Sequence, residues 1–378
     1  MKIRIKPADM LFFRDSKPFE RGEDHWAESM FFPNLTTIYG ALRTACIAGR
    51  PKDFDKLNTD EDPTRGLRIK KTGYLYKNRL YYTAPADLVV EKEELDRSED
   101  ALSEGEAYTA ILLSCQKIEN QWNSLYSEEQ IEYVFTAPEG KQVAGLSIPV
   151  LDAETGFEDY VSTKQENHLV DLKQCIGLED RMGIARNDRK RTAEEGLIYR
   201  ISQVRYSDLE LMVEMEWENG EELLPDEGFL KVGGQGNASY YCKYSEPERP
   251  PEEPADKKVK YMKYMKLYLP VPAIFKNGWI PDFITDTEKK TGQLSLGDKE
   301  YKVKLISACI PGSVNIGGFD MKKKREKPFR RAVMAGSVYL LELEDSCVMP
   351  GAVKEIWLQS EQQKEGYGLA YMIGMEKL

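Results

Sequence analysis

Alternating apolar and polar positions predict short strands along most of the chain. Residues 2–6 place Ile3 and Ile5 on one face and charged side chains on the other, which is the period of a half-buried strand. Similar patterns predict strands at residues 68–76, 79–90, 197–206, 209–217, 258–269, 301–307, 331–343 and 370–373. Long connections separate these strands instead of regular βαβ repeats, so the pattern favours an α+β fold over a doubly wound parallel sheet.

A helical period replaces this alternation after residue 33. The spacing i, i+3, i+4 and i+7 predicts a helix whose buried face carries Ile38, Ala41, Leu42 and Ala45. Asn34 or Thr36 can cap the start of this helix, and Gly49 can end it. Tyr39 and Arg43 share its other face.

A polar, proline-rich segment at residues 245–257 predicts a linker between two domains, residues 1–244 and 258–378. Both parts end with a glycine-rich loop and a short aromatic strand, at residues 228–241 and 365–372. This weak internal repeat fits two ferredoxin-like (RRM-like) domains with inserted hairpins and loops. The acidic residues 91–106 predict a solvated helix or an insertion.

Composition indicates a soluble globular protein, with 31% charged and 41% hydrophobic residues. No apolar run approaches the roughly 18 residues of a membrane helix, so we expect a cytoplasmic protein without a membrane partner. Six scattered cysteines lack a C-x-x-C pair, and only two histidines are present, so neither a metal nor another cofactor is expected. The net charge of -11 disfavours indiscriminate nucleic-acid binding. Screening over roughly 8 Å still permits a local basic site.

A basic hairpin is predicted around residues 181–199. Apolar residues lead into a tip that carries Arg186, Arg189, Lys190 and Arg191, and a strand returns from Leu197. Thr192 and Glu195 have the spacing of a capping box. A projecting cation cluster in an acidic protein indicates phosphate binding, although a plain solvated turn has a similar sequence.

The densest basic run is at residues 317–331, which contain seven cations, two acids and the rings of Phe319 and Phe329. Cations attract phosphates and aromatic rings stack on bases, so Lys322 and Lys323 are candidate RNA contacts. Lysine-rich loops also occur simply as solvated loops, and these lysines equally suit an acidic protein partner.

A glycine-rich loop provides another candidate phosphate site. Gly233, Gly234 and Gly236 expose backbone N–H groups without large side chains, as phosphate-binding loops do. The loop has neither the P-loop pattern nor a complete G-x-G-x-x-G, and a tight turn between strands explains the glycines equally well.

The N-terminal segments FFRDSKPF and FPNLTTIYGALRTA resemble the signature of the third Cmr subunit, a RAMP-superfamily component of type III-B CRISPR effector complexes. Further similar blocks occur in family order within residues 179–206, 228–241 and 317–339. The family's glycine-rich loop often carries charged residues where Gln235 and Asn237 stand here, which favours backbone donors over side chains in this loop.

The resemblance implies two ferredoxin-like domains and a non-catalytic RNA-binding subunit. Such a subunit binds the 5' tag of the crRNA, docks onto the large palm-domain subunit and adjoins a backbone RAMP subunit. Under this hypothesis, phosphate contacts come from Arg14, Lys17, Arg43 and the 186–191 tip, and backbone contacts come from residues 233–236.

Two other functions remain open from the sequence. A metal-independent CRISPR RNA-processing endoribonuclease needs an acid and a base around a 2'-hydroxyl, and only His25 or His168 supplies an imidazole. No G-x-S-x-G or H-E-x-x-H motif occurs, so we expect no enzyme activity. A structural adaptor, whose basic loops contact acidic proteins, is the third possibility.

Overall fold

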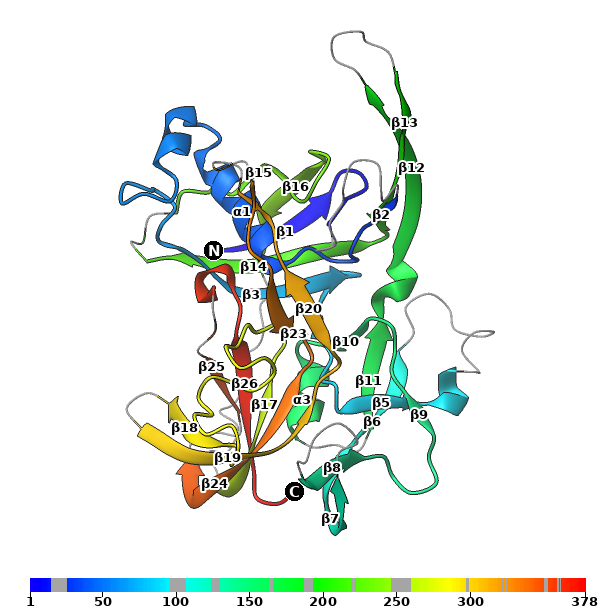
Figure 1. Ribbon diagram of the computed structural model, residues 1–378, viewed down its shortest axis with the longest axis vertical. Coiled ribbons are helices and arrows are strands. Elements are labelled where there is room, and N and C mark those ends of the chain that lie inside the picture. Colours follow the sequence, from blue (N-terminus) through cyan, green and yellow to red (C-terminus); the bar gives the residue numbers. More distant parts are fainter. Residues whose placement is uncertain are drawn as a thin grey trace.

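The computed structural model of the protein describes most of the chain (Figure 1). The described residues are 1–14, 26–95, 107–123, 130–162, 166–186, 193–218, 220, 222–245, 260–296, 299–320, 323, 325–349, 353–358, 360 and 362–378. Their fold is mixed, with mostly β-sheet and few helices. No helix among these residues is long and apolar enough to cross a membrane.

One long sheet has the strand order β15-β16-β1-β14-β3-β4-β10-β11-β6-β5-β9. Its strands are β1 (Lys2–Pro7), β3 (Leu67–Tyr76), β4 (Arg79–Thr83), β5 (Leu88–Glu91), β6 (Tyr108–Leu112), β9 (Val143–Ala144), β10 (Pro149–Asp152), β11 (Glu166–Asp171), β14 (Leu209–Trp217), β15 (Glu227–Lys231) and β16 (Ala238–Lys243). The neighbouring pairs in this order are antiparallel.

The first strand confirms its predicted faces. Ile3 and Ile5 are 0% and 1% exposed and pair with Val213 and Leu211 of β14. Residues directly opposite in a ladder share a face, so these four side chains form one apolar row. The row belongs to the same hydrophobic cluster as α1 (Leu35–Ile47).

Helix α1 begins and ends close to its predicted limits. Ile38, Ala41 and Leu42 are buried as predicted. Asn34 occupies the N-cap position, although neither its side chain nor another caps the helix. The expectation that Tyr39 lies on a separate face from the core is wrong. Its ring is buried, and its hydroxyl donates a hydrogen bond to the Leu67 carbonyl at 3.2 Å.

A second sheet has the order β18-β19-β24-β17-β26-β25. Its strands are β17 (Lys260–Tyr268), β18 (Thr291–Leu296), β19 (Lys299–Cys309), β24 (Val338–Met349), β25 (Val353–Trp357) and β26 (Leu369–Met375). Between β19 and β24 the chain forms a ribbon of β20 (Ser313–Ile316) and β23 (Arg330–Val333), whose connection contains β21 (Phe319–Asp320) and β22 (Arg325–Glu326).

Two segments predicted as single strands are each divided by a turn. Residues 79–90 form β4 and β5, and residues 331–343 form β23 and the start of β24. The two dividing turns touch each other, because the Ala86 N–H donates to the Gly336 carbonyl at 2.8 Å. Gly336 has a φ of +89°, and a Cβ there would lie 2.6 Å from the Ala84 carbonyl oxygen. These breaks therefore follow from a long-range contact.

A long hairpin projects beyond the sheets (Figure 1). It consists of β12 (Ile176–Arg186) and β13 (Ala193–Tyr206), with β2 (Trp26–Glu28) parallel to β13. The other elements are the hairpin of β7 (Ser114–Asn123) and β8 (Gln130–Thr136), the helix α3 (Thr155–Val161), and the 3-10 helices η1 (Pro51–Lys56), η2 (Leu172–Cys175) and η3 (Gln363–Glu365).

The two sheets share their hydrophobic interior. Tyr367 and Leu369 from the C-terminal part belong to the cluster around α1, together with Val271 and Ile274. The boundaries at 244 and 258 stay predictions, because most of the expected linker lies outside the described residues. Most of the acidic stretch at 91–106 lies outside them as well.

A buried ion pair lies where the sheets meet. The Lys266 ammonium of β17 donates to the Asp87 carboxylate at 2.6 Å, and the two side chains are 6% and 0% exposed. The Tyr160 hydroxyl of α3 donates to the same carboxylate at 3.0 Å. Burial, and then the negative charge of Asp87, raise the pKa of Tyr160 well above its ordinary value, so the phenol stays a donor.

Candidate nucleic-acid interface

The segment that follows β1 holds several candidate elements together. Leu11 and Val204 of β13 exchange two backbone hydrogen bonds of 2.8 Å. Phe13 accepts a bond from the Met30 N–H, and Arg14 forms a bridge with Ser29. Arg14 is therefore an exposed side chain beside the base of the projecting hairpin. The other predicted cation of this segment, Lys17, lies outside the described residues.

The glycine-rich loop packs against the same segment. The Gly234 N–H donates to the Phe12 carbonyl at 2.8 Å. Gly233 has a φ of +86°, and a Cβ there would lie 2.4 Å from that carbonyl oxygen. Only glycine fits such a close backbone approach. Gly236 has a φ of +72° and no atom near its Cβ position, so the outer side of the loop is open.

This contact changes the expected chemistry of the loop. The Gly234 N–H, one of the predicted phosphate donors, is already bonded to Phe12. Asn237 donates through its side-chain amide to the Met10 carbonyl. Gly233, Gly234 and Asn237 therefore fix the loop to the N-terminal segment, and Gly236 remains at the open side.

The predicted hairpin is present as β12 and β13. Its arms are joined by ion pairs, including Arg205 with Glu179 at 2.8 Å and Arg200 with Asp180. Arg186 ends β12. The tip residues Arg189, Lys190 and Arg191 lie outside the described residues, so their contacts with RNA stay predictions.

Arg43 faces a turn of its own chain. Its guanidinium donates to the Thr64 hydroxyl at 2.7 Å, to the Asn58 side-chain oxygen at 3.1 Å, and to the Asp62 carboxylate. Burial opposes ionisation of Asp62, but hydrogen bonds from Asn58 and Thr64 and the charge of Arg43 lower its pKa overall. Arg43 therefore clamps the 58–64 turn onto α1, a role that the helix pattern did not reveal.

The basic run lies beside the start of α1. A Cβ on Gly318 would be 3.7 Å from the Thr36 methyl group, and the Lys327 N–H donates to the Gly318 carbonyl at 2.8 Å. The Phe329 ring is 52% exposed and packs over Gly317, where a Cβ would lie 2.5 Å from it. Lys323 is exposed, and Lys322 lies outside the described residues.

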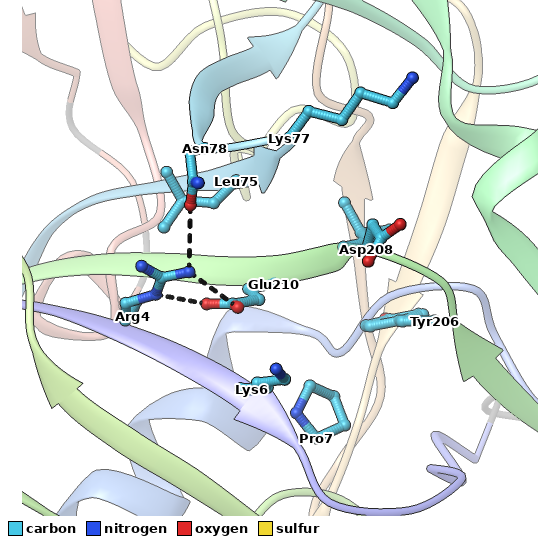
Figure 2. A pocket seen from close by; sticks show the side chains of 10 residues that line it. Arg4, Lys6, Pro7, Leu75, Lys77, Asn78, Tyr206, Asp208 and Glu210 are labelled. Carbon is cyan, nitrogen blue, oxygen red and sulfur yellow. Dashed lines mark hydrogen bonds and ion pairs between the residues drawn. The ribbon is translucent and has the colours of Figure 1, made fainter. Parts of the chain in front are cut away.

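A polar hollow of about 310 Å³ lies on the face of the first sheet opposite α1 (Figure 2). The Arg4 guanidinium donates two hydrogen bonds to the Glu210 carboxylate, at 2.6 and 2.8 Å, and contacts Asn78. Lys6 and Lys77 also line the hollow. The sequence pointed to this face without identifying the hollow, because the alternation in residues 2–6 places its charged side chains opposite the core.

Of the two histidines, the structure describes only His168. His168 is exposed on β11, which β10, β4, β3 and β14 separate from β1 in the sheet. His25 lies outside the described residues. No group of three His, Cys, Asp or Glu side chains suited to a metal ion occurs among the residues described.

The structure therefore brings Arg14, the glycine-rich loop and the base of the hairpin together around residues 9–14. Together with the two antiparallel sheets, these elements define a mostly β protein with a projecting hairpin. A family model for "CRISPR-associated protein (Cas_Cmr3)" matches residues 3–375, and the chain belongs to this family. It is accordingly a component of a type III-B CRISPR complex, and the resemblance seen in its sequence is confirmed.

Solved structures provide more distant matches. One is a chain of the type III-B Cmr-beta complex bound to cognate target RNA and AMPPnP, with 14% identity, a TM-score of 0.48, and coverage of 90% of this chain and 86% of that one. Another is a chain of the Csm3–Csm4 subcomplex of the type III-A CRISPR-Cas interference complex, with 14% identity, a TM-score of 0.32, and coverage of 93% and 99%. A search of curated proteins found no match.

Proposed function

We propose that this chain is a non-catalytic RNA-binding subunit that holds the 5' tag end of the crRNA. It docks onto the large palm-domain subunit and adjoins a backbone RAMP subunit. One observation carries the proposal: residues 9–14 bond to both β13 and the glycine-rich loop, which gathers Arg14, the loop and the hairpin base. Three elements far apart in sequence thereby form one surface suited to the end of an RNA strand.

The order of the strands supports two ferredoxin-like domains. The first sheet contains β16-β1-β14-β3, which is the fourth, first, third and second strand of an antiparallel unit, with α1 joining the first two. The second sheet contains β26-β17-β24-β19 in the same order, without crossover helices among the described residues. The two glycine-rich loops precede β16 and β26, the fourth strand of each unit.

Charge reversal at the hairpin tip tests the proposal. Arg189→Glu, Lys190→Glu and Arg191→Glu together should weaken crRNA binding by the assembled complex. Each lost phosphate contact should also reduce the slope of log affinity against log salt concentration by about 0.7, because fewer counterions are released from a single strand. Affinity is measured by filter binding across a salt series.

A triple variant with exposed lysines on the other half, Lys276→Glu, Lys299→Glu and Lys354→Glu, is the matched control for net charge. If both triple variants change affinity and slope equally, the tip assignment is wrong. Copurification from the native host provides an independent check, since small RNAs with a shared 5' tag should accompany the complex.

The non-catalytic part of the proposal has its own test. Repeat RNA incubated with the protein in EDTA should stay intact. Cleavage that disappears in His25→Ala or His168→Ala would establish the endoribonuclease instead. A structural adaptor would leave no crosslinked adduct between this chain and the guide.

A further inference from the structure

The edge of the first sheet carries aromatic and cationic side chains that the tag-binding proposal does not use. Tyr240 of β16 pairs with Phe229 of β15 on one side and with Lys6 of β1 on the other. Opposed residues in antiparallel strands share a face, so these three side chains form a row across the strands. Lys231, two residues after Phe229, lies on the same face.

This row is on the open face of the sheet. Ile3 and Ile5 point from β1 into the core, so Lys6 and Arg4 lie on the opposite side. Figure 2 shows both at the polar hollow. Phe229 is 69% exposed, and Lys6 and Lys231 are exposed. The C-terminal part covers this face at β3, where Lys71 pairs with Glu355 at 2.6 Å. The row at β15, β16 and β1 stays uncovered by the described chain.

The two rings are held in a fixed arrangement. Their centroids are 5.6 Å apart, and their planes meet at 64°. The Tyr240 hydroxyl donates to the Glu227 carboxylate at 2.6 Å, and this bond raises the pKa of Tyr240 to about 12. The two rings therefore contact each other at a steep angle, and Phe229 still remains 69% exposed.

The charges beside the rings are suited to a polyanion. Among the described residues, neither Lys6 nor Lys231 forms an ion pair with a carboxylate, whereas Arg4 is neutralised by Glu210. Glu227, two residues before Phe229 on β15, is bonded to Tyr240. Two lysines therefore flank an exposed ring, and Lys6 also lies at the edge of the polar hollow.

A protein partner fits this surface less well. In the described part of the chain, Phe229 is the one large hydrophobic side chain of β15, β16 and β1 that is exposed. A protein interface has an apolar core of several contiguous side chains, whereas a base needs one ring to stack on and a nearby cation for its phosphate.

We propose that Phe229, Tyr240, Lys231 and Lys6 form a platform that binds unpaired nucleotides of single-stranded RNA. The base stacks on Phe229, and the lysines contact the phosphates. The platform rests on the proposed RNA-binding function and extends it. The glycine-rich loop connects β15 to β16 and is bonded to Phe12, so RNA held at that loop has a direct path onto the platform.

Crosslinking in the assembled complex locates the contact. 4-Thiouridine is placed in the crRNA in one experiment and in a complementary target RNA in another, which identifies the strand that is bound. Trypsin cleaves after Lys231, so Phe229 lies on the peptide 206–231 and the glycine-rich loop on the peptide 232–243. We expect an adduct at Phe229.

Substitutions separate stacking from general hydrophobic contact. Phe229→Leu keeps an apolar side chain but cannot stack, and it should weaken binding of the crosslinked strand roughly tenfold. Phe229→Tyr keeps an aromatic ring and should therefore retain wild-type affinity. The double variant Lys6→Gln, Lys231→Gln should reduce the slope of log affinity against log salt concentration by about 1.4, because each of the two phosphate contacts contributes about 0.7. Phe54→Leu, at another exposed phenylalanine, is the control and should change nothing.

Other outcomes overturn the proposal in distinguishable ways. Adducts elsewhere on this chain, together with unchanged affinity in Phe229→Leu, would reject the platform and leave the RNA-binding function standing. Loss of a protein subunit from the Phe229→Leu complex without loss of RNA affinity would identify a protein-docking surface. No RNA adduct anywhere on the chain would reject the proposed function as well.

Discussion

Single residues in this protein often have roles that their chemical type does not reveal. Arg43 had the appearance of an exposed helix cation, yet three hydrogen bonds direct its guanidinium to the 58–64 turn. Gly233 and Gly234 had the appearance of phosphate-binding glycines, yet their lack of side chains is required by the approach of Phe12. In both cases a distant segment of the chain determines what the residue contacts.

The glycines of the loop allow a test of this explanation. Gly233→Ala and Gly236→Ala each place an L side chain at positive φ, which costs about 1 to 2 kcal/mol. Gly233→Ala should lower the free energy of unfolding by more than Gly236→Ala, because only its Cβ would clash with the Phe12 carbonyl. Urea denaturation of both variants measures the difference, and equal losses would contradict the close-approach account.

At the scale of elements, periodicity predicted local structure well where one face is buried. Strand β1 and helix α1 have their predicted apolar faces, because a two-residue or 3.6-residue period places those side chains on one side of the backbone. Periodicity failed at residues 84–87 and 334–337. There the turns bond to each other across the molecule, and locally only Pro85 and Gly336 mark the breaks.

The whole molecule is held together by contacts between the two sheets. In loop 84–87 the Ala86 N–H donates to the Gly336 carbonyl. The Asp87 carboxylate of the same loop accepts hydrogen bonds from Lys266 and Tyr160 in the interior. The Tyr268 hydroxyl donates to the Thr83 carbonyl at the same place. Buried charges this far from water are tolerated only when they are paired, so this contact fixes how the sheets meet.

Removing one charge of the buried pair should therefore be costly. Lys266→Met leaves the Asp87 carboxylate buried without its cation and should lower the free energy of unfolding by about 3 to 5 kcal/mol. Adding Asp87→Asn should recover part of that loss, because the amide carries no charge. Denaturant unfolding measures both variants.

The exposed pair Lys304–Glu132 provides the control for this prediction. Lys304→Met should change stability by about 1 kcal/mol or less, because the pair is solvated. A Lys266→Met protein as stable as this control would contradict the proposed role of the buried pair.

The sequence by itself determined the faces of β1 and α1, the hairpin of β12 and β13, and the family, because these follow from local periodicity and from motifs in a fixed order. Only the tertiary structure decided the strand order, the shared interior, and the gathering of Arg14, the glycine-rich loop and the hairpin around residues 9–14. It also revealed the row of Phe229, Tyr240 and Lys6. These features depend on pairings between segments up to about 240 residues apart, as for Ile3 and Lys243, and no local spacing encodes which strand becomes the neighbour of β1.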